Sequence, residues 1–167
     1  MTLIARLRII LNDVDPMPMR HIEVPLKFRL DRLHEVIQAA MGWTDTHLYE
    51  FRVGDAGWGM PDPDGFYDGP MDAKKMTLEK LLDQTATRTI QYVYDFGDDW
   101  DHSIRIERVG EADKGMTYPR LLKATGALSA RGRRRSLGLR RVPRSSRRSR
   151  SRATRGHGPV VGWGLRR

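Results

Sequence analysis

The sequence predicts an α+β fold, with a mostly antiparallel sheet and helices packed on one face, followed by an Arg-rich C-terminal tail. Three observations carry this prediction. Apolar and polar residues alternate in several segments, two other segments have helical periodicity, and a short polar turn joins the last two alternating segments. The 167 residues suit one domain of ordinary size, and no cysteine is present to form disulfides or thiolate metal sites.

The first two strands and the first helix follow from the N-terminal third of the chain. Residues 1–12 alternate with Leu and Ile on one face and therefore form a strand. A turn rich in Asp and Pro then leads into a second strand over residues 20–25, antiparallel to the first. Helical spacing starts at Leu30, with Asp31 as the expected N-cap, and Gly42 ends the helix.

The remaining elements are a strand, a second helix and a hairpin. Residues 47–53 alternate as a strand, and residues 55–70 form a long loop rich in Gly, Pro and Asp. Thr77 is placed to cap a short second helix. Residues 89–96 and 102–109 alternate strongly and are joined by GDDW, so they form a β-hairpin.

Charge divides the chain into two parts. Residues 1–127 carry 16 Lys and Arg against 21 Asp and Glu, which gives a net charge of −5. Residues 128–167 carry 14 Arg and no Lys, Asp or Glu, so the net charge of +9 comes from this segment. We expect a folded domain over residues 1–127 and a tail over residues 128–167, disordered because it has little apolar surface to bury.

Candidate chemistry gathers around the hairpin turn. Neighbouring carboxylates and an imidazole can bind a divalent cation or act as general acid and base. The alternative is that the aspartates only shape the turn through hydrogen bonds to the backbone. The candidate polar cluster comprises His47, Glu50, Asp95, Asp98, Asp99 and His102. His47 and Glu50 point to opposite faces of their strand, and His21 and His34 are predicted at the surface.

Four strings carry a family resemblance. They are LHEVIQAAMGWTDTHLYEF (residues 33–51), PDPD (61–64), YDFGDDWDH (94–102) and YPRLL (118–122). In this order they resemble the plasmid pRiA4b ORF-3-like family, also called insertion-element passenger (TnpR-type) proteins, over about residues 3–127. The resemblance implies a bacterial or archaeal protein carried on plasmids or near mobile elements, and it implies no particular biochemical activity.

Beyond residue 127 the sequence departs from that family, whose members continue with Cys-Pro-Pro-Glu-Asp. Codons for residues 128–143 can be chosen so that the same bases, read one base later, encode CPPEDVGGPWGYAEF. We therefore expect residues 128–167 to be a frameshifted reading of GC-rich DNA, which sequencing the gene at the Ala127 codon tests. The alternative is a functional arm that binds nucleic acid non-specifically through Arg133, Arg134, Arg135, Arg147, Arg148 and Arg150.

Three functions stay open on this evidence. The first is a non-enzymatic accessory or binding module of a plasmid or mobile element, which contacts protein or nucleic acid. The second is an acid/base or metal-dependent enzyme that uses the candidate polar cluster and a divalent metal. The third is a truncated product without a retained function. Because no complete catalytic motif is present, the sequence favours the first.

The location follows from what the sequence lacks. No segment approaches the roughly 18 apolar residues of a membrane span. The N-terminus has neither a basic region before its apolar run nor a small-residue cleavage site. We expect a cytoplasmic protein that does not bind membranes.

Overall fold

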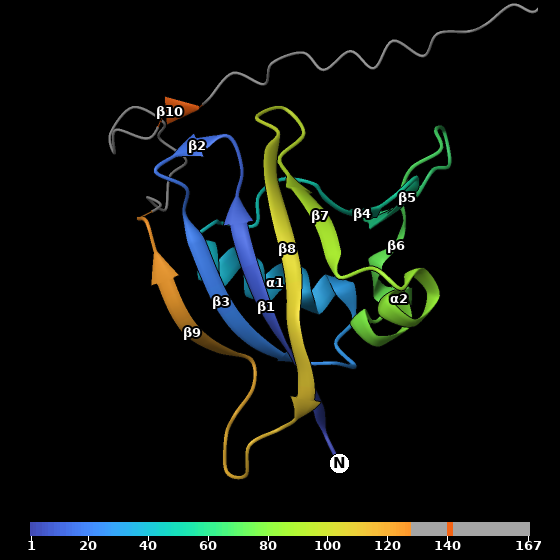
Figure 1. Cartoon of the computed structure of the whole chain (residues 1–167). Coiled ribbons are helices and arrows are strands. Elements are labelled where there is room, and N and C mark those ends of the chain that lie inside the picture. The colour runs from blue at the N-terminus through green and yellow to red at the C-terminus, as the bar shows by residue number, and fades with distance from the viewer. Residues whose placement is uncertain (128–139, 142–167) are drawn as a thin grey trace, which may run out of the picture.

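One large sheet and two helices make up the domain (Figure 1). The computed structural model describes residues 1–127 and 140–141. Its elements are β1 Leu3–Leu11, β2 Val14–Asp15, β3 Met19–Pro25, α1 Leu30–Met41, β4 Tyr49–Val53, β5 Ala56–Gly59, β6 Met71–Asp72, the 3-10 turn η1 Ala73–Lys75, α2 Leu78–Thr85, β7 Thr89–Tyr94, β8 Trp100–Glu111, β9 Arg120–Thr125 and β10 Arg140–Arg141. This order confirms the predicted α+β class.

The sheet has eight strands in the order β6-β5-β4-β7-β8-β1-β3-β9. Every neighbouring pair in it is antiparallel except β5 and β6. The predicted pairing of the first two strands is present as β1 with β3, and the predicted hairpin as β7 with β8. The long central strands β1 and β8 pair along their whole length, which places residues about 100 positions apart side by side.

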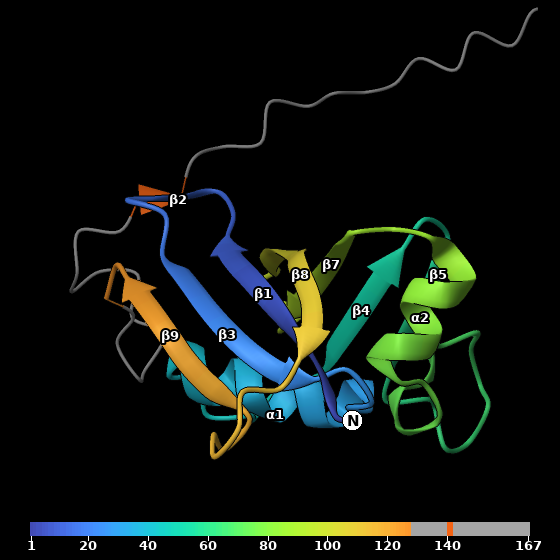
Figure 2. The same cartoon turned by 60° about the horizontal axis from the view of Figure 1, so that its bottom comes forward.

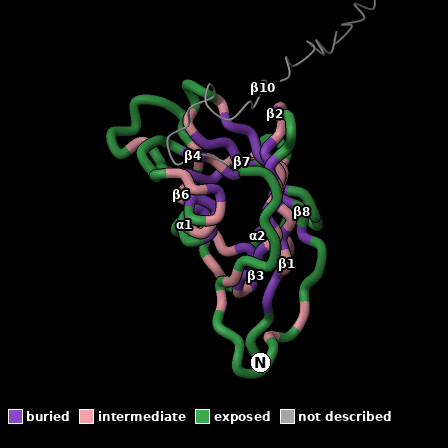
Figure 3. The backbone as a smooth tube through the Cα atoms, turned by 90° about the vertical axis from the view of Figure 1, so that its left-hand side faces the viewer, coloured by how far each residue is buried: buried purple, intermediate pink, exposed green. Residues whose placement is uncertain are grey.

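The two faces of the sheet differ because side chains alternate along each strand. On β1, Leu7, Ile9 and Leu11 are fully buried on one face. Both helices lie on that face, α1 beneath β3 and β1, as Figure 2 shows. Figure 3 shows that buried residues concentrate in the strands and α1, whereas the connecting loops are exposed. The opposite face of β7, β8, β1, β3 and β9 is covered by no helix among the described residues (Figure 1).

Helix α1 begins two residues earlier than an Asp31 cap requires. Arg29 occupies the N-cap position without a side-chain cap, and Asp31 lies in the first turn, paired with the Arg29 guanidinium at 2.8 Å. The predicted cap was therefore wrong, although a carboxylate in the first turn still favours the helix dipole. Gly42 ends α1 as predicted, because its φ of 74° suits a residue without Cβ. Thr77 caps α2, its hydroxyl accepting from the Lys80 amide.

The segment expected to be one long loop, residues 55–70, is partly a strand. Residues Ala56–Gly59 form β5, which pairs with β4. Two of its four residues are glycines, so the strand shows no alternation of apolar side chains. Both glycines are explained by packing. A Cβ at Gly57 would collide with the Glu50 side chain on the neighbouring strand, and one at Gly59 would collide with the backbone of Tyr49.

Strand β9 was not predicted at all. It forms one edge of the sheet beside β3, and most of its side chains are exposed, so it lacks the apolar alternation that marks a half-buried strand. The expected tail over residues 128–167 lies outside the described residues except for Arg140–Arg141, which pair with β2. No helix in the described part of the chain is long and apolar enough to cross a membrane.

Candidate functional site

The hairpin turn is shaped by Asp95. Its carboxylate accepts hydrogen bonds from the amides of Gly97 and Asp98 at 3.1 and 3.3 Å, and its backbone adopts a φ of 59°. Asp99 also adopts a positive φ within the same turn. These contacts are the turn architecture that aspartate side chains commonly provide.

The structure separates the rest of the candidate polar cluster. His47 lies beside Asp95, with Nε2 at 3.5 Å from the carboxylate, and is half exposed. Glu50 points to the other side of the sheet, where it pairs with Arg52 at 2.6 Å. Among the residues that the structure describes, no three His, Asp or Glu side chains are grouped so that they could hold a metal ion.

His102 lies inside the core. It is fully buried, and its Nδ1–H faces the carbonyl oxygens of Trp100 and Tyr92 at 3.0 and 3.2 Å. Burial lowers the pKa of His102 to about 4, so the ring is neutral near pH 7. Its Nε2 has no hydrogen-bond partner within the described residues. A neutral imidazole enclosed in this way has no route to a substrate at the surface.

His34, expected at the surface, is also buried and organises a network that the sequence did not reveal. It shares the inner face of α1 with Leu30 and Ile37. Because burial lowers its pKa, the neutral ring donates from Nε2 to the Asp45 carboxylate at 2.6 Å and accepts the hydroxyl of Tyr92 at Nδ1. Gln38, one turn along α1, donates to the same hydroxyl at 2.9 Å.

This network contains the residue types of an acid/base relay, but its imidazole and phenol are buried and do not face a substrate. Tyr92 is fully buried, and burial raises the pKa of its phenol well above the ordinary value. The ring of His34 stacks on Tyr49 at 3.6 Å between centroids. The Tyr92 hydroxyl donates to His34 and accepts from Gln38, so these two hydrogen bonds connect α1 to β7.

The uncovered face of the sheet carries a different group of side chains. Two adjacent rows cross the strands in register, one through Arg105, Arg8, His21 and Lys123, the other through Arg108, Arg6, Glu23 and Arg120. We call these two rows, together with Glu107 at the bulge of β8, the arginine face. Five arginines and one lysine against two carboxylates give it a charge of +4, which leaves −9 for the rest of residues 1–127.

Like charges lie directly opposite one another in this face. Arg8 is paired in register with Arg105, and Arg6 with Arg108, on the two central strands. The carboxylates relieve part of the repulsion. Glu23, almost fully buried, accepts from Arg6 at 2.8 Å and from Arg120 at 2.6 Å, whereas Arg8 approaches Glu107 only to 3.6 Å.

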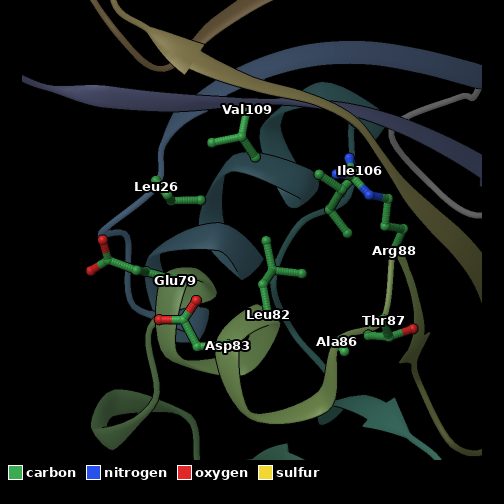
Figure 4. Close-up of a pocket in the computed structure, with 9 residues that line it drawn as sticks. All are labelled: Leu26, Glu79, Leu82, Asp83, Ala86, Thr87, Arg88, Ile106 and Val109. Carbon is green, nitrogen blue, oxygen red and sulfur yellow. The ribbon is translucent and has the colours of Figure 1, made fainter.

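Two hollows lie on other parts of the described surface. One of about 260 Å³ lies between α2 and β8, where apolar side chains surround it and the carboxylates of Glu79 and Asp83 lie opposite Arg88 (Figure 4). The other, of about 460 Å³, lies beside Trp58 and the prolines of the following loop. Neither hollow includes a residue of the candidate polar cluster. The six arginines assigned to a basic arm, from Arg133 to Arg150, lie outside the described residues.

The chain is thus an α+β domain in which one sheet face is the helix-covered core and the other is an open, arginine-rich surface. Residues 3–130 match the family described as plasmid pRiA4b ORF-3-like protein, and the chain belongs to this family. The predicted resemblance is thereby confirmed.

The chain is also similar to two individual proteins. The chain is 50% identical over 123 residues to "Uncharacterized protein y4hQ" of Sinorhizobium fredii (strain NBRC 101917 / NGR234), a match covering 74% of this chain and 62% of that protein. The matched part thus spans less than two thirds of the relative. The fold is similar to the crystal structure of protein of unknown function MM3350 from Methanosarcina mazei Go1, with a TM-score of 0.68 and 26% identity over 75% of this chain and 71% of that chain.

Proposed function

We propose that the chain is a non-enzymatic binding module that holds an anionic partner on the arginine face. The observation that carries the proposal is the placement of Arg8 opposite Arg105 and Arg6 opposite Arg108 in the middle of the sheet. Like charges directly opposite on neighbouring strands destabilise a sheet. Arginines placed against one another at a cost in stability indicate a role in binding.

The exposure and ion pairing of these arginines also support a role in binding. Arg105 and Arg108 are exposed and form no ion pair within the described residues, so their guanidinium groups are available to a partner. The arginine face carries a charge of +4 whereas the rest of residues 1–127 carries −9, so the face is a region of positive charge on an acidic domain. Such a concentration attracts and orients a partner of opposite charge.

The enzyme alternative has less to support it. Of its candidate residues, His102 is enclosed in the core, Glu50 faces the opposite side of the sheet and Asp95 is engaged in the turn. An acid/base role for the exposed His47–Asp95 pair is tested by Asp95→Asn and His47→Ala variants together with metal analysis of the purified chain. Stoichiometric metal that either variant loses would favour the enzyme.

Binding to immobilised heparin tests the proposed anion-binding face. The variant Arg105→Gln/Arg108→Gln removes two cations from the face, and Lys74→Gln/Lys80→Gln removes two from η1 and α2 on the covered side. Residues 128–167 are the same in all three proteins, so their arginines contribute equally. We expect the face variant to elute at clearly lower salt than both the wild type and the control. Elution together with the control would overturn the proposal.

A further inference from the structure

We infer that the anionic partner is double-stranded nucleic acid, held by its phosphates on both sides of one groove. This inference rests on the proposed function and adds the class of partner and the way it lies. It follows from how the cations are distributed within the arginine face, from the residue types there, and from what the face lacks.

The cations form two separate banks. Arg6, Arg8, Arg105 and Arg108 make up the inner bank on the neighbouring strands β1 and β8. Arg120 and Lys123 make up the outer bank on β9. Strand β3 lies between the banks, and its two positions in the same rows are His21 and Glu23. A strip without an available cation therefore divides two cationic strips that run side by side.

The separation of the banks matches the dimensions of a duplex. Neighbouring strands lie about 4.8 Å apart, so the middle of the inner bank is roughly 12 Å from β9. The major groove of B-form DNA is also about 12 Å wide, with a phosphate backbone on each side. Along each strand, positions two apart are separated by roughly 6.6 Å, which allows consecutive arginines to contact different phosphates.

Glu23 positions one cation of each bank. Its carboxylate binds Arg6 of the inner bank and Arg120 of the outer bank, and Arg120 is also held by Asp113 at 3.0 Å. Burial raises the pKa of Glu23, but the hydrogen bonds from the two guanidinium groups outweigh it and lower the pKa overall. The carboxylate thus stays charged and keeps both arginines extended across the face.

The residue types also favour a phosphate backbone. Five of the six cations are arginine, whose planar guanidinium binds phosphate oxygens in a bidentate manner. The next row across the face has the uncharged polar residues Gln91, Ser103 and Thr125 towards its ends and the apolar Ile10 and Met19 between them. Polar side chains of this kind contact phosphate and sugar in nucleic-acid complexes.

Single strands and small anions fit the face less well. Proteins that bind single strands stack the bases on aromatic side chains. The strand positions of the arginine face present no Phe, Tyr or Trp within the described residues, and the neighbouring Tyr118 ring is covered by the Arg120 guanidinium at 5.4 Å from its centroid. Small anions are bound in concave sites, and neither of the two hollows described above, beside α2 and beside Trp58, includes a residue of this face.

Salt-dependent binding to a DNA duplex of about two helical turns tests this inference. The proteins are the full-length chain, the inner-bank variant Arg105→Gln/Arg108→Gln, the outer-bank variant Lys123→Gln and the control Lys74→Gln/Lys80→Gln. Each lost phosphate contact should reduce the slope of log K against log salt by about 0.9. We expect a reduction of about 1.8 for the inner bank and 0.9 for the outer bank. At physiological salt these correspond to roughly 30-fold and 5-fold weaker binding.

The same titrations with single-stranded DNA and with inorganic polyphosphate separate the possible failures. Loss of duplex binding in both bank variants but not in the control supports the inference. Bank variants that weaken binding to heparin and polyphosphate but leave duplex binding unchanged overturn the duplex assignment, while the proposed function stands. If the bank variants weaken binding to single-stranded DNA and to the duplex equally, the duplex assignment is also overturned. If the bank variants leave binding to all of these polyanions unchanged, both proposals are overturned.

Discussion

The two faces of the sheet are built from the same strands and put their polar residues to opposite uses. On the covered face, His34, His102 and Tyr92 are buried, neutral and bonded within the protein. On the open face, Arg105 and Arg108 are charged, exposed and placed against further arginines. Alternation along a strand puts neighbours such as Leu7 and Arg8 on these different faces.

The open face, rather than the polar residues of the core, is where a function of this chain is to be sought. Histidine and tyrosine are the residues that usually suggest catalysis, yet here they stabilise the core. Arginine on a sheet surface usually suggests nothing more than solubility, yet here its register creates a cost that folding alone does not explain. A substitution on the covered face should therefore change stability, whereas one on the open face should change binding.

The largest expected effect comes from truncating the covered face of β1. Leu7 is fully buried in the core, so Leu7→Ala should lower the free energy of unfolding by about 3 kcal/mol or more, through lost burial and the cavity left behind. Its neighbour Arg8 provides the matched control, because Arg8→Gln changes the open face only. Urea denaturation measures both. Comparable losses in the two variants would contradict the division of roles between the faces.

Acid should destabilise the covered face through His102. Its pKa is about 4 in the folded protein and about 6.5 when unfolded, so the unfolded state binds the extra proton. The contribution to stability is complete above pH 6.5 and is lost as the pH falls towards 4, by about 3 kcal/mol in total. The stabilising contribution of Glu23 is lost only at lower pH, because the pKa of its carboxyl lies below the ordinary 4.5.

Unfolding free energies measured between pH 7 and pH 4.5 check this expectation. His102→Gln should flatten the dependence on pH even if it lowers stability throughout. Thr89→Ala, an exposed position of β7 with no titratable side chain, should leave the slope as it is. An unchanged slope in the His102 variant would show that another group is responsible.

Removing the Tyr92 hydroxyl should have a smaller effect. Tyr92→Phe leaves the buried His34 Nδ1 and Gln38 Nε2 without their shared partner, at a cost of about 2 kcal/mol. Tyr49→Phe is the control, because no hydrogen bond is recorded for that hydroxyl among the described residues, although its ring stacks on His34. Thermal unfolding compares the two. Equal shifts would mean that ring packing rather than the hydroxyl network stabilises this region.

The fold could be predicted from the sequence wherever periodicity was strong. Strands β1, β3, β7 and β8 and helix α1 were found because burial on one side left an alternating or helical pattern. Strand β5 was missed because glycines carry no side chain to alternate, and β9 because an edge strand buries too little. His34 was placed at the surface because a single polar residue on a helix does not reveal which face is buried.

The arginine face could not be predicted for a different reason. Arg6 and Arg8 alternate visibly in β1, but their partners Arg105 and Arg108 are about 100 residues away, and a bulge between Arg6 and Leu7 shifts the register. Without the pairing, four arginines in an acidic domain look like scattered surface charge. The pairing of β1 with β8 is what turns them into a site.

The smallest expected effect is also the one that separates stability from binding most directly. Because Arg105 lies opposite Arg8, Arg105→Gln should relieve repulsion and raise the free energy of unfolding by about 0.5 kcal/mol at low salt. The gain should disappear near 1 M salt, where charges are screened within about 3 Å. Arg32→Gln on α1, which breaks an exposed pair with Glu35, should instead lose a few tenths of a kcal/mol. A stabilised protein that binds its anionic partner more weakly is what a binding face predicts, whereas a destabilised Arg105 variant would mean that these arginines serve the fold.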